Sequence, residues 1–213
     1  TVRHNYPMLS LSNSYSEGDI LDFHQRTTKT LDQQIEYVCE LKFDGLAIGL
    51  RYENGILVQA VTRGDGVQGD DVTANVKTIR SIPLQLKGDF PPVFEIRGEI
   101  YFPHESFNAL NNQRIDDGLP PFANPRNAAA GTLKMQDSAE VARRKLDCWL
   151  YYLMGDKLPF KSHYESLTAA KRWGFRISSQ MAVCSNIGEV FDYINDWKIG
   201  RYELPFDIDG VVI

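Results

Sequence analysis

The sequence has little that favours a membrane protein, a disulfide framework or a zinc site. No run in the 213 residues approaches the roughly 18 apolar residues that a membrane-spanning helix needs, and no charged-then-apolar secretory leader is visible. The three cysteines, Cys39, Cys148 and Cys184, form no Cys-x-x-Cys pair. We therefore expect buried thiols in a reducing compartment, the cytoplasm, rather than a structural metal site.

The sequence also lacks the basic excess that is typical of a domain binding nucleic acid by itself. It has 23 Lys and Arg against 28 Asp and Glu, a net charge of −5. Because neutralising phosphates takes clustered cations, a role on nucleic acid requires a local basic patch or further domains. A composition of 43% hydrophobic and 24% charged residues excludes a disordered, collagen-like or coiled-coil chain. The first residue is Thr1 and not Met, so we expect a fragment.

Strand and helix patterns follow one another without a regular βαβ repeat, which predicts an α+β fold. An extended segment over 1–14 precedes a helix expected over 17–36, where apolar residues recur at helical spacing. Strands over 46–52 and 56–61 form a hairpin around Asn54-Gly55, which supplies the positive φ angles of a tight turn. The remaining expected elements are strands over 37–43, 93–102, 147–154 and 209–213, helices over 72–79, 103–112, 163–173 and 187–198, and an irregular segment over 118–136.

The motif Glu40-Leu41-Lys42-Phe43-Asp44-Gly45 places a lysine at the end of an expected strand. A lysine in a sheet-walled pocket can be desolvated, which lowers its pKa and frees the amine to attack an electrophile. Asp44 would share a face with Lys42 and could orient it, and Gly45 would let the backbone pass close to a ligand. The alternative is a hairpin edge that carries a solvated lysine.

A second motif, Glu95-Ile96-Arg97-Gly98-Glu99, places three charged residues on one strand face at a spacing of two. Gly98 would leave space beside Glu99 for a bulky group. A solvated sheet surface is the alternative, and for this motif in isolation it is the favoured one.

A third motif, Asp207-Ile208-Asp209-Gly210, leads into a strand that is apolar over 211–213 and is expected to be buried. Carboxylates at the mouth of a buried strand suit a metal ion or a cationic partner. A simple turn is the alternative, since Asp and Gly favour turns.

In this order the three motifs resemble those of the covalent nucleotidyltransferases: DNA ligases, RNA ligases and capping enzymes. Their longer context resembles the adenylation domain of NAD⁺-dependent DNA ligases, over nearly the whole chain. The blocks that carry this resemblance are Pro7-Met8-Leu9-Ser10-Leu11, Cys39-Glu40-Leu41-Lys42-Phe43-Asp44-Gly45-Leu46-Ala47, Thr62-Arg63-Gly64-Asp65-Gly66, Asn75-Val76-Lys77-Thr78-Ile79-Arg80-Ser81-Ile82-Pro83, Phe122-Ala123-Asn124-Pro125-Arg126-Asn127-Ala128-Ala129-Ala130-Gly131 and Phe206-Asp207-Ile208-Asp209-Gly210-Val211-Val212-Ile213.

The resemblance implies that Lys42 attacks the α-phosphorus of NAD⁺, expels nicotinamide mononucleotide and keeps AMP as a phosphoramidate. This is the first step of sealing 5′-phosphate/3′-hydroxyl nicks in duplex DNA by a DNA ligase. Glu40 would accept a hydrogen bond from the amino group of adenine, and Tyr151 would stack on the base, although core packing is the alternative for Tyr151. The other residues that the resemblance places on the nucleotide are Ser10, Leu11, Arg63 and Glu99.

The resemblance also implies charged residues around the phosphates. Asp44 and Asp209 match essential carboxylates that hold the lysine and a hydrated Mg²⁺, with Asp209 as the metal contact through water. Arg126 and Arg201 match basic residues that bind the 5′-phosphate of the nick or the leaving group. Lys134 stands where the family often has Arg and would bind DNA phosphate without Arg's two-pronged geometry. The histidines that match no catalytic position, and that we expect to be ordinary surface or packing residues, are His4, His24, His104 and His163.

We therefore expect residues 1–213 to form an adenylation domain with the nucleotidyltransferase core, antiparallel sheets flanked by helices. We expect it to end before the family's last phosphate-binding lysine and to lack the segment that binds nicotinamide mononucleotide. Such a chain would be a monomer that binds NAD⁺ or AMP but cannot seal nicks without the DNA-encircling domains. The alternatives are an ATP-dependent ligase, a capping-type nucleotidyltransferase or a non-catalytic adenine-nucleotide-binding module.

Overall fold

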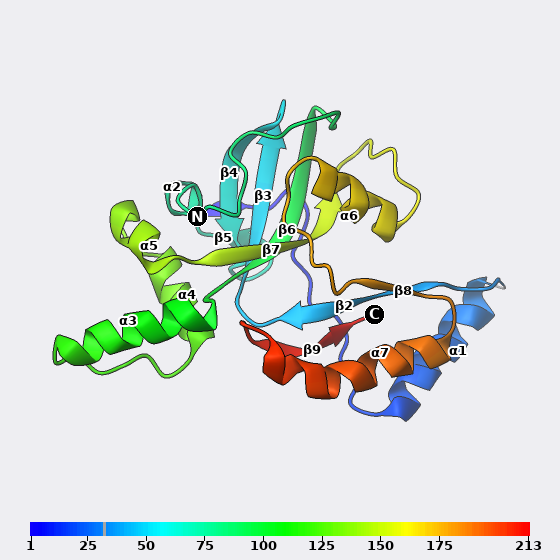
Figure 1. Cartoon of the computed structure of the whole chain (residues 1–213). Helices are drawn as coiled ribbons and strands as arrows, with labels where there is room; N and C mark the ends of the chain where they lie inside the picture. The colour runs from blue at the N-terminus through cyan, green and yellow to red at the C-terminus, as the bar shows by residue number, and fades with distance from the viewer. Residues whose placement is uncertain (32) are drawn as a thin grey trace.

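Two antiparallel sheets lie side by side in the computed structural model, which describes residues 1–31 and 33–213 (Figure 1). The four-stranded sheet has the order β4 (Ile56–Thr62), β3 (Leu46–Glu53), β6 (Val93–Tyr101), β7 (Asp147–Met154). The three-stranded sheet has the order β8 (Ala182–Cys184), β2 (Tyr37–Phe43), β9 (Ile208–Val212). A short pair, β1 (Val2–Arg3) with β5 (Gln68–Gly69), ties the N-terminus to the loop after β4.

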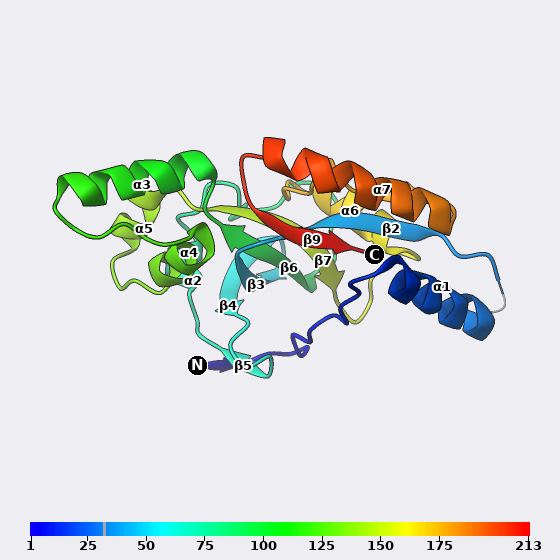
Figure 2. The same cartoon turned by 90° about the horizontal axis from the view of Figure 1, so that it is seen from below.

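Helices surround the two sheets (Figures 1 and 2). Three of them gather at one end of the molecule: α3 (His104–Asp116), α4 (Pro125–Leu133) and α5 (Ser138–Arg144). On the opposite side, α7 (Ile187–Gly200) lies along the three-stranded sheet with α1 (Glu17–Leu31) beside it. The remaining helices are α2 (Thr73–Val76), α6 (His163–Arg172), which packs on β7, and the 3₁₀ turn η1 (Arg201–Glu203). Among the described residues no helix is both long and apolar enough to cross a membrane.

The expected mixture of helices and antiparallel strands is confirmed, and so is the Asn54-Gly55 turn, with φ angles of 50° and 79°. Three predictions about helices are wrong. The helix expected over 17–36 ends at Leu31, position 32 lies outside the described residues, and 33–36 are not helical. The helix expected over 72–79 covers only α2, and the irregular segment expected over 118–136 contains α4.

Local chemistry explains the unexpected helix α4. The side chain of Asn124 accepts a hydrogen bond from the backbone N–H of Asn127, and Pro125 occupies the first helical position, where no N–H is needed. Ala128, Ala129 and Leu133 are buried on one face of the helix. The small residues therefore let the helix pack closely on the sheet. The prolines alone predict an irregular segment, because they give no sign of this contact. α5 and β8 were not expected either.

Each sheet packs on its own hydrophobic core, and a cluster of aromatic side chains packs between the two sheets. Alternate residues of β2 are buried, in a core that also contains Phe206. Phe43 of β2 stacks on Trp149 of β7 at a centroid distance of 5.6 Å, and Phe206 contacts both rings, each at 5.7 Å. The three cysteines are free and buried, as expected. The packing between Phe43 and Trp149 brings the end of β2 against β7, the last strand of the other sheet.

Candidate active site

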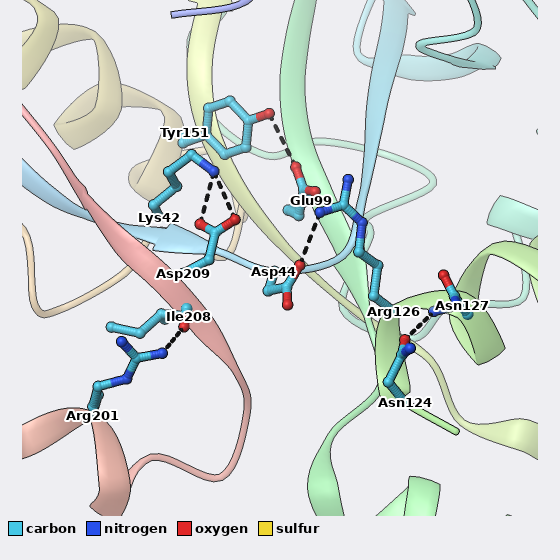
Figure 3. Close-up of polar contacts among 10 residues, drawn as sticks. All are labelled: Lys42, Asp44, Glu99, Asn124, Arg126, Asn127, Tyr151, Arg201, Ile208 and Asp209. Carbon is cyan, nitrogen blue, oxygen red and sulfur yellow. Dashed lines mark hydrogen bonds and ion pairs between the residues drawn. The ribbon is translucent and has the colours of Figure 1, made fainter. Parts of the chain in front are cut away.

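Lys42 projects from the face of β2 that is turned away from the hydrophobic core. Its Nζ donates to both carboxylate oxygens of Asp209, at 2.7 and 2.8 Å (Figure 3). The side chain of Lys42 is 43% exposed, so the expectation of a desolvated lysine is wrong. The lysine lies near the end of β2, the central strand of its sheet, where the carboxylate of Asp209 holds its ammonium group in place.

A β-bulge brings Asp209 to Lys42. Leu41 pairs with Val211 and Phe43 with Ile208, so Asp209 and Gly210 together oppose Lys42 alone. Gly210 has a φ angle of 150°, which side chains rarely adopt and glycine tolerates. The strand expected to be buried over 211–213 is only half-buried, because β9 is bonded to β2 on one side alone among the described strands.

Asp44 does not orient Lys42, contrary to the expectation. β2 ends at Phe43, so the alternation of faces stops there, and the carboxylate of Asp44 accepts from Nη1 of Arg126 at 3.1 Å (Figure 3). Gly45 was expected to let the backbone pass close to a ligand, but it lies against the backbone of β6 instead. A Cβ at Gly45 would overlap the carbonyl oxygen of Ile100 in β6.

A second bulge, between β6 and β7, brings Tyr151 to Glu99. Arg97 pairs with Tyr152 and Gly98 with Leu150, so Tyr151 is the extra residue, and its hydroxyl donates to Glu99 at 3.3 Å. The three charged residues of β6 share one face, as expected. Gly98 leaves no open space, because a Cβ there would overlap the carbonyl oxygen of Trp149.

Burial dominates the electrostatics of Glu99. It raises the pKa of this carboxyl from 4.5 to about 7. The hydrogen bond from Tyr151 and the charges of Arg126 and Lys42 oppose the shift without cancelling it. A carboxyl that gains or loses a proton near neutral pH therefore lies beside the lysine.

The N-terminal segment crosses the same face of β6 and carries Ser10 and Leu11. The guanidinium of Arg97 donates to the backbone carbonyls of Tyr6 and Pro7, at 2.7 and 2.9 Å. Further along, Arg63 donates to the hydroxyl of Ser10 at 2.7 Å. Sequence reasoning placed Ser10 and Arg63 on the nucleotide separately, and the structure brings them into direct contact.

The three predicted phosphate-binding cations occupy different places. Arg126, on the first turn of α4, reaches the lysine site and is 58% exposed. Arg201 donates to the backbone carbonyl of Ile208, next to Asp209 (Figure 3). Lys134 forms an ion pair with Asp70 at 3.0 Å instead of joining the group around Lys42.

Two histidines that sequence reasoning set aside contact residues of the motifs. Nε2 of His163 lies 2.7 Å from Oε2 of Glu40, and Nε2 of His104 lies 2.7 Å from Oδ1 of Asp207. The sequence carries no signal for either contact, because the partners are 123 and 103 residues apart.

The sequence matches a known family over its whole length. The model of the NAD-dependent DNA ligase adenylation domain matches residues 1–213. The chain belongs to this family. It is 56% identical to a DNA ligase of Flavobacterium psychrophilum over 214 residues, 59% identical to one of Bacteroides fragilis over 213 residues and 53% identical to one of Cytophaga hutchinsonii over 214 residues. Each match covers 100% of this chain and 32% of the relative, so the chain spans about a third of these relatives' length.

Proposed function

We propose that this domain, with a nucleotidyltransferase core, transfers AMP from NAD⁺ to Lys42 and releases nicotinamide mononucleotide. In the natural protein this step would begin the sealing of 5′-phosphate/3′-hydroxyl nicks in duplex DNA. The observation that carries the proposal is the contact between Nζ of Lys42 and Asp209, 2.7 Å apart, in a chain that belongs to this family over its whole length.

In the proposed reaction a bond forms between Nζ of Lys42 and the α-phosphorus, and the bond from that phosphorus to the departing mononucleotide oxygen breaks. The ammonium group must first lose a proton, and the Asp209 carboxylate is the acceptor in contact with it. Phosphoryl-type transfer depends mainly on positioning and on neutralising charge. Arg126 supplies a cation beside the lysine for the phosphate oxygens.

The carboxylates suit a Mg²⁺ ion that is shared with the substrate. Among residues 1–31 and 33–213, no group of three or more His, Cys, Asp or Glu side chains could hold a metal alone. Mg²⁺ keeps several waters and commonly binds one or two carboxylates together with substrate phosphates. Asp209, with Asp44 nearby, would hold such an ion through water, and the ion would supply positive charge to the phosphates.

The remaining predicted contacts divide between base, sugar and DNA. Glu40 and Tyr151 would bind adenine, and Ser10 with Leu11 would contact the nucleotide. Arg63 and Glu99 would contact the ribose and phosphate. The residues proposed for DNA or leaving-group phosphate are Arg126, Arg201 and Lys134. We also propose a cytoplasmic, monomeric protein. The net charge of −5 supports a domain that works on DNA only together with other domains.

Intact mass spectrometry of the full-length protein after incubation with NAD⁺ and Mg²⁺ tests this function, because the full-length protein also supplies the segment that binds nicotinamide mononucleotide. We expect the full-length protein to gain one adenylyl group, and its Lys42→Ala variant to gain none. Lys42→Arg is the matched control, because arginine keeps the positive charge next to Asp209 but is not a nucleophile at neutral pH. Adenylation of either variant, or transfer from ATP in preference to NAD⁺, would contradict the proposal.

A further inference from the structure

His163 is held against Glu40 at a defined place in the fold. It is the first residue of α6, and the preceding Ser162 accepts the backbone N–H of Glu165, which anchors the start of that helix. Nε2 of His163 lies 2.7 Å from Oε2 of Glu40, and the two side chains are only 30% and 12% exposed. The ring of Tyr152 lies 6.0 Å from the imidazole. The position of the imidazole is therefore set by α6 on one side and by β7 on the other.

We propose that His163 is a positioning residue that fixes the carboxylate of Glu40 and so selects a 6-aminopurine over a 6-oxopurine. This inference rests on the proposed function, in which Glu40 binds the base. Glu40 and Lys42 share one face of β2, because the residues between and beside them are buried in the core. A base bound at Glu40 would therefore lie on the same side of the strand as the nucleophile.

The selection follows from the hydrogen-bonding capacity of a carboxylate, which accepts and cannot donate. With Nε2 protonated, His163 donates to Oε2 of Glu40 and leaves Oε1 for the amino group of adenine. A 6-oxopurine presents an oxygen at that place, which a carboxylate repels. It also carries an N1–H donor, which a carboxylate free to turn could reach. The hydrogen bond from His163 prevents that turn, so the 6-oxopurine cannot be accommodated.

The test compares NAD⁺ with its hypoxanthine analogue as donors to Lys42. We expect His163→Leu to lower the preference for NAD⁺, measured as the ratio of the two kcat/KM values, by roughly tenfold, the size expected for one hydrogen bond to a charged group. His163→Gln keeps an N–H donor and should retain most of the preference. His163→Asn also introduces a side-chain amide, but its N–H is too close to the backbone to reach Oε2 of Glu40. We expect it to lose the preference for NAD⁺ as His163→Leu does.

His104→Leu is the matched control. His104 also begins a helix and also contacts a carboxylate at 2.7 Å, that of Asp207. Its loss should leave the preference for NAD⁺ unchanged, whatever it does to the rate. An unchanged ratio in His163→Leu and His163→Asn, or an equal fall in His104→Leu, would overturn the proposal.

Failure of this proposal can be told from failure of the proposed function. If the unmodified full-length protein takes no AMP from NAD⁺, the proposed function is wrong. If the chain does become adenylated but its His163 variants keep the wild-type ratio, only the role of His163 is wrong. Calorimetric binding of AMP and IMP to the same variants gives a second readout that needs no catalysis, and the same change in preference is expected there.

Discussion

At the scale of single residues, the site joins charges from distant parts of the chain. Lys42 and Asp209 are 167 residues apart, and Arg126 and Asp44 are 82 apart. These side chains are partly exposed, and pairs of that kind add little to stability. In the proposed reaction they would hold a nucleophile, a proton acceptor and a cation within reach of one phosphate.

Glu99 makes stability depend on pH. Its pKa is about 7 in the folded chain, against an ordinary value of 4.5. Between these values the folded chain binds more protons than the unfolded one, so its stability falls as pH rises through this window. Above pH 7 the cost of burying the ionised carboxylate is fully present.

Glu99→Gln, which cannot ionise, should therefore be more stable than the unmodified chain at pH 8, by about 3 kcal/mol at most. The difference should shrink toward pH 5. Urea unfolding of both proteins at several pH values measures this. Parallel stability curves over pH 5 to 8 would show that burial does not raise the pKa of Glu99.

At the scale of elements, two bulges determine which side chains face the site. One places Asp209 opposite Lys42, and the other places Tyr151 on Glu99. A regular ladder would alternate side chains between the two faces of each sheet. The extra residue in each bulge changes that alternation beside a residue that we propose to be functional, Lys42 in one sheet and Glu99 in the other.

Gly98→Ala should disrupt the bulge between β6 and β7. The added Cβ would overlap the carbonyl oxygen of Trp149, so we expect a loss of about 2 kcal/mol in the free energy of unfolding. Gly131→Ala in α4 is the control, since its Cβ would meet nothing within 4 Å, and alanine favours a helix by up to about 1 kcal/mol. Chemical denaturation measures the free energy of unfolding of both variants. Equal effects would show that the bulge does not require glycine.

The N-terminal segment depends on Arg97. Replacing Arg97 by Met removes two donors to backbone carbonyls, those of Tyr6 and Pro7, and leaves the segment that carries Ser10 less well placed. We expect KM for NAD⁺ in AMP transfer to rise about tenfold with a smaller change in kcat. Initial rates at varied NAD⁺ measure this. A fall in kcat at unchanged KM would show that Arg97 acts on the chemical step instead.

At the scale of the whole molecule, an aromatic group couples the two sheets. Phe206 precedes β9 and contacts Phe43, Tyr101 and Trp149, which come from three other strands. Phe94 is also buried, but in the other core, against Tyr52, Trp173 and Phe175. The position of β9, and so of Asp209, depends on the aromatic residues around Phe206 and not on those around Phe94.

Phe206→Leu and Phe94→Leu should therefore each cost about 1 kcal/mol of stability, and only Phe206→Leu should slow AMP transfer markedly. Thermal unfolding together with the rate of adenylation at a temperature where both variants are folded measures the two effects. Equal rates in both variants would show that the packing between the sheets does not control the site.

Much of the fold could be predicted from local patterns. Residue types typical of strands indicated β2, charged residues at a spacing of two indicated β6, and Asn54-Gly55 indicated the turn between β3 and β4. The prolines over 118–136 were misleading, because α4 begins at Pro125 and is stabilised by an Asn cap and by contact with the sheet. A prediction from local sequence cannot include that contact between α4 and the sheet.

The sequence by itself determined the α+β class, the order of the three motifs and the lysine that carries the proposed chemistry, because each depends on residue type and short spacing. Only the tertiary structure decided the partners: Asp209 rather than Asp44 on Lys42, Arg126 on Asp44, and His163 on Glu40. These contacts depend on where bulges fall and on how two sheets pack. Both are set by interactions between residues far apart in the chain, which no local pattern records.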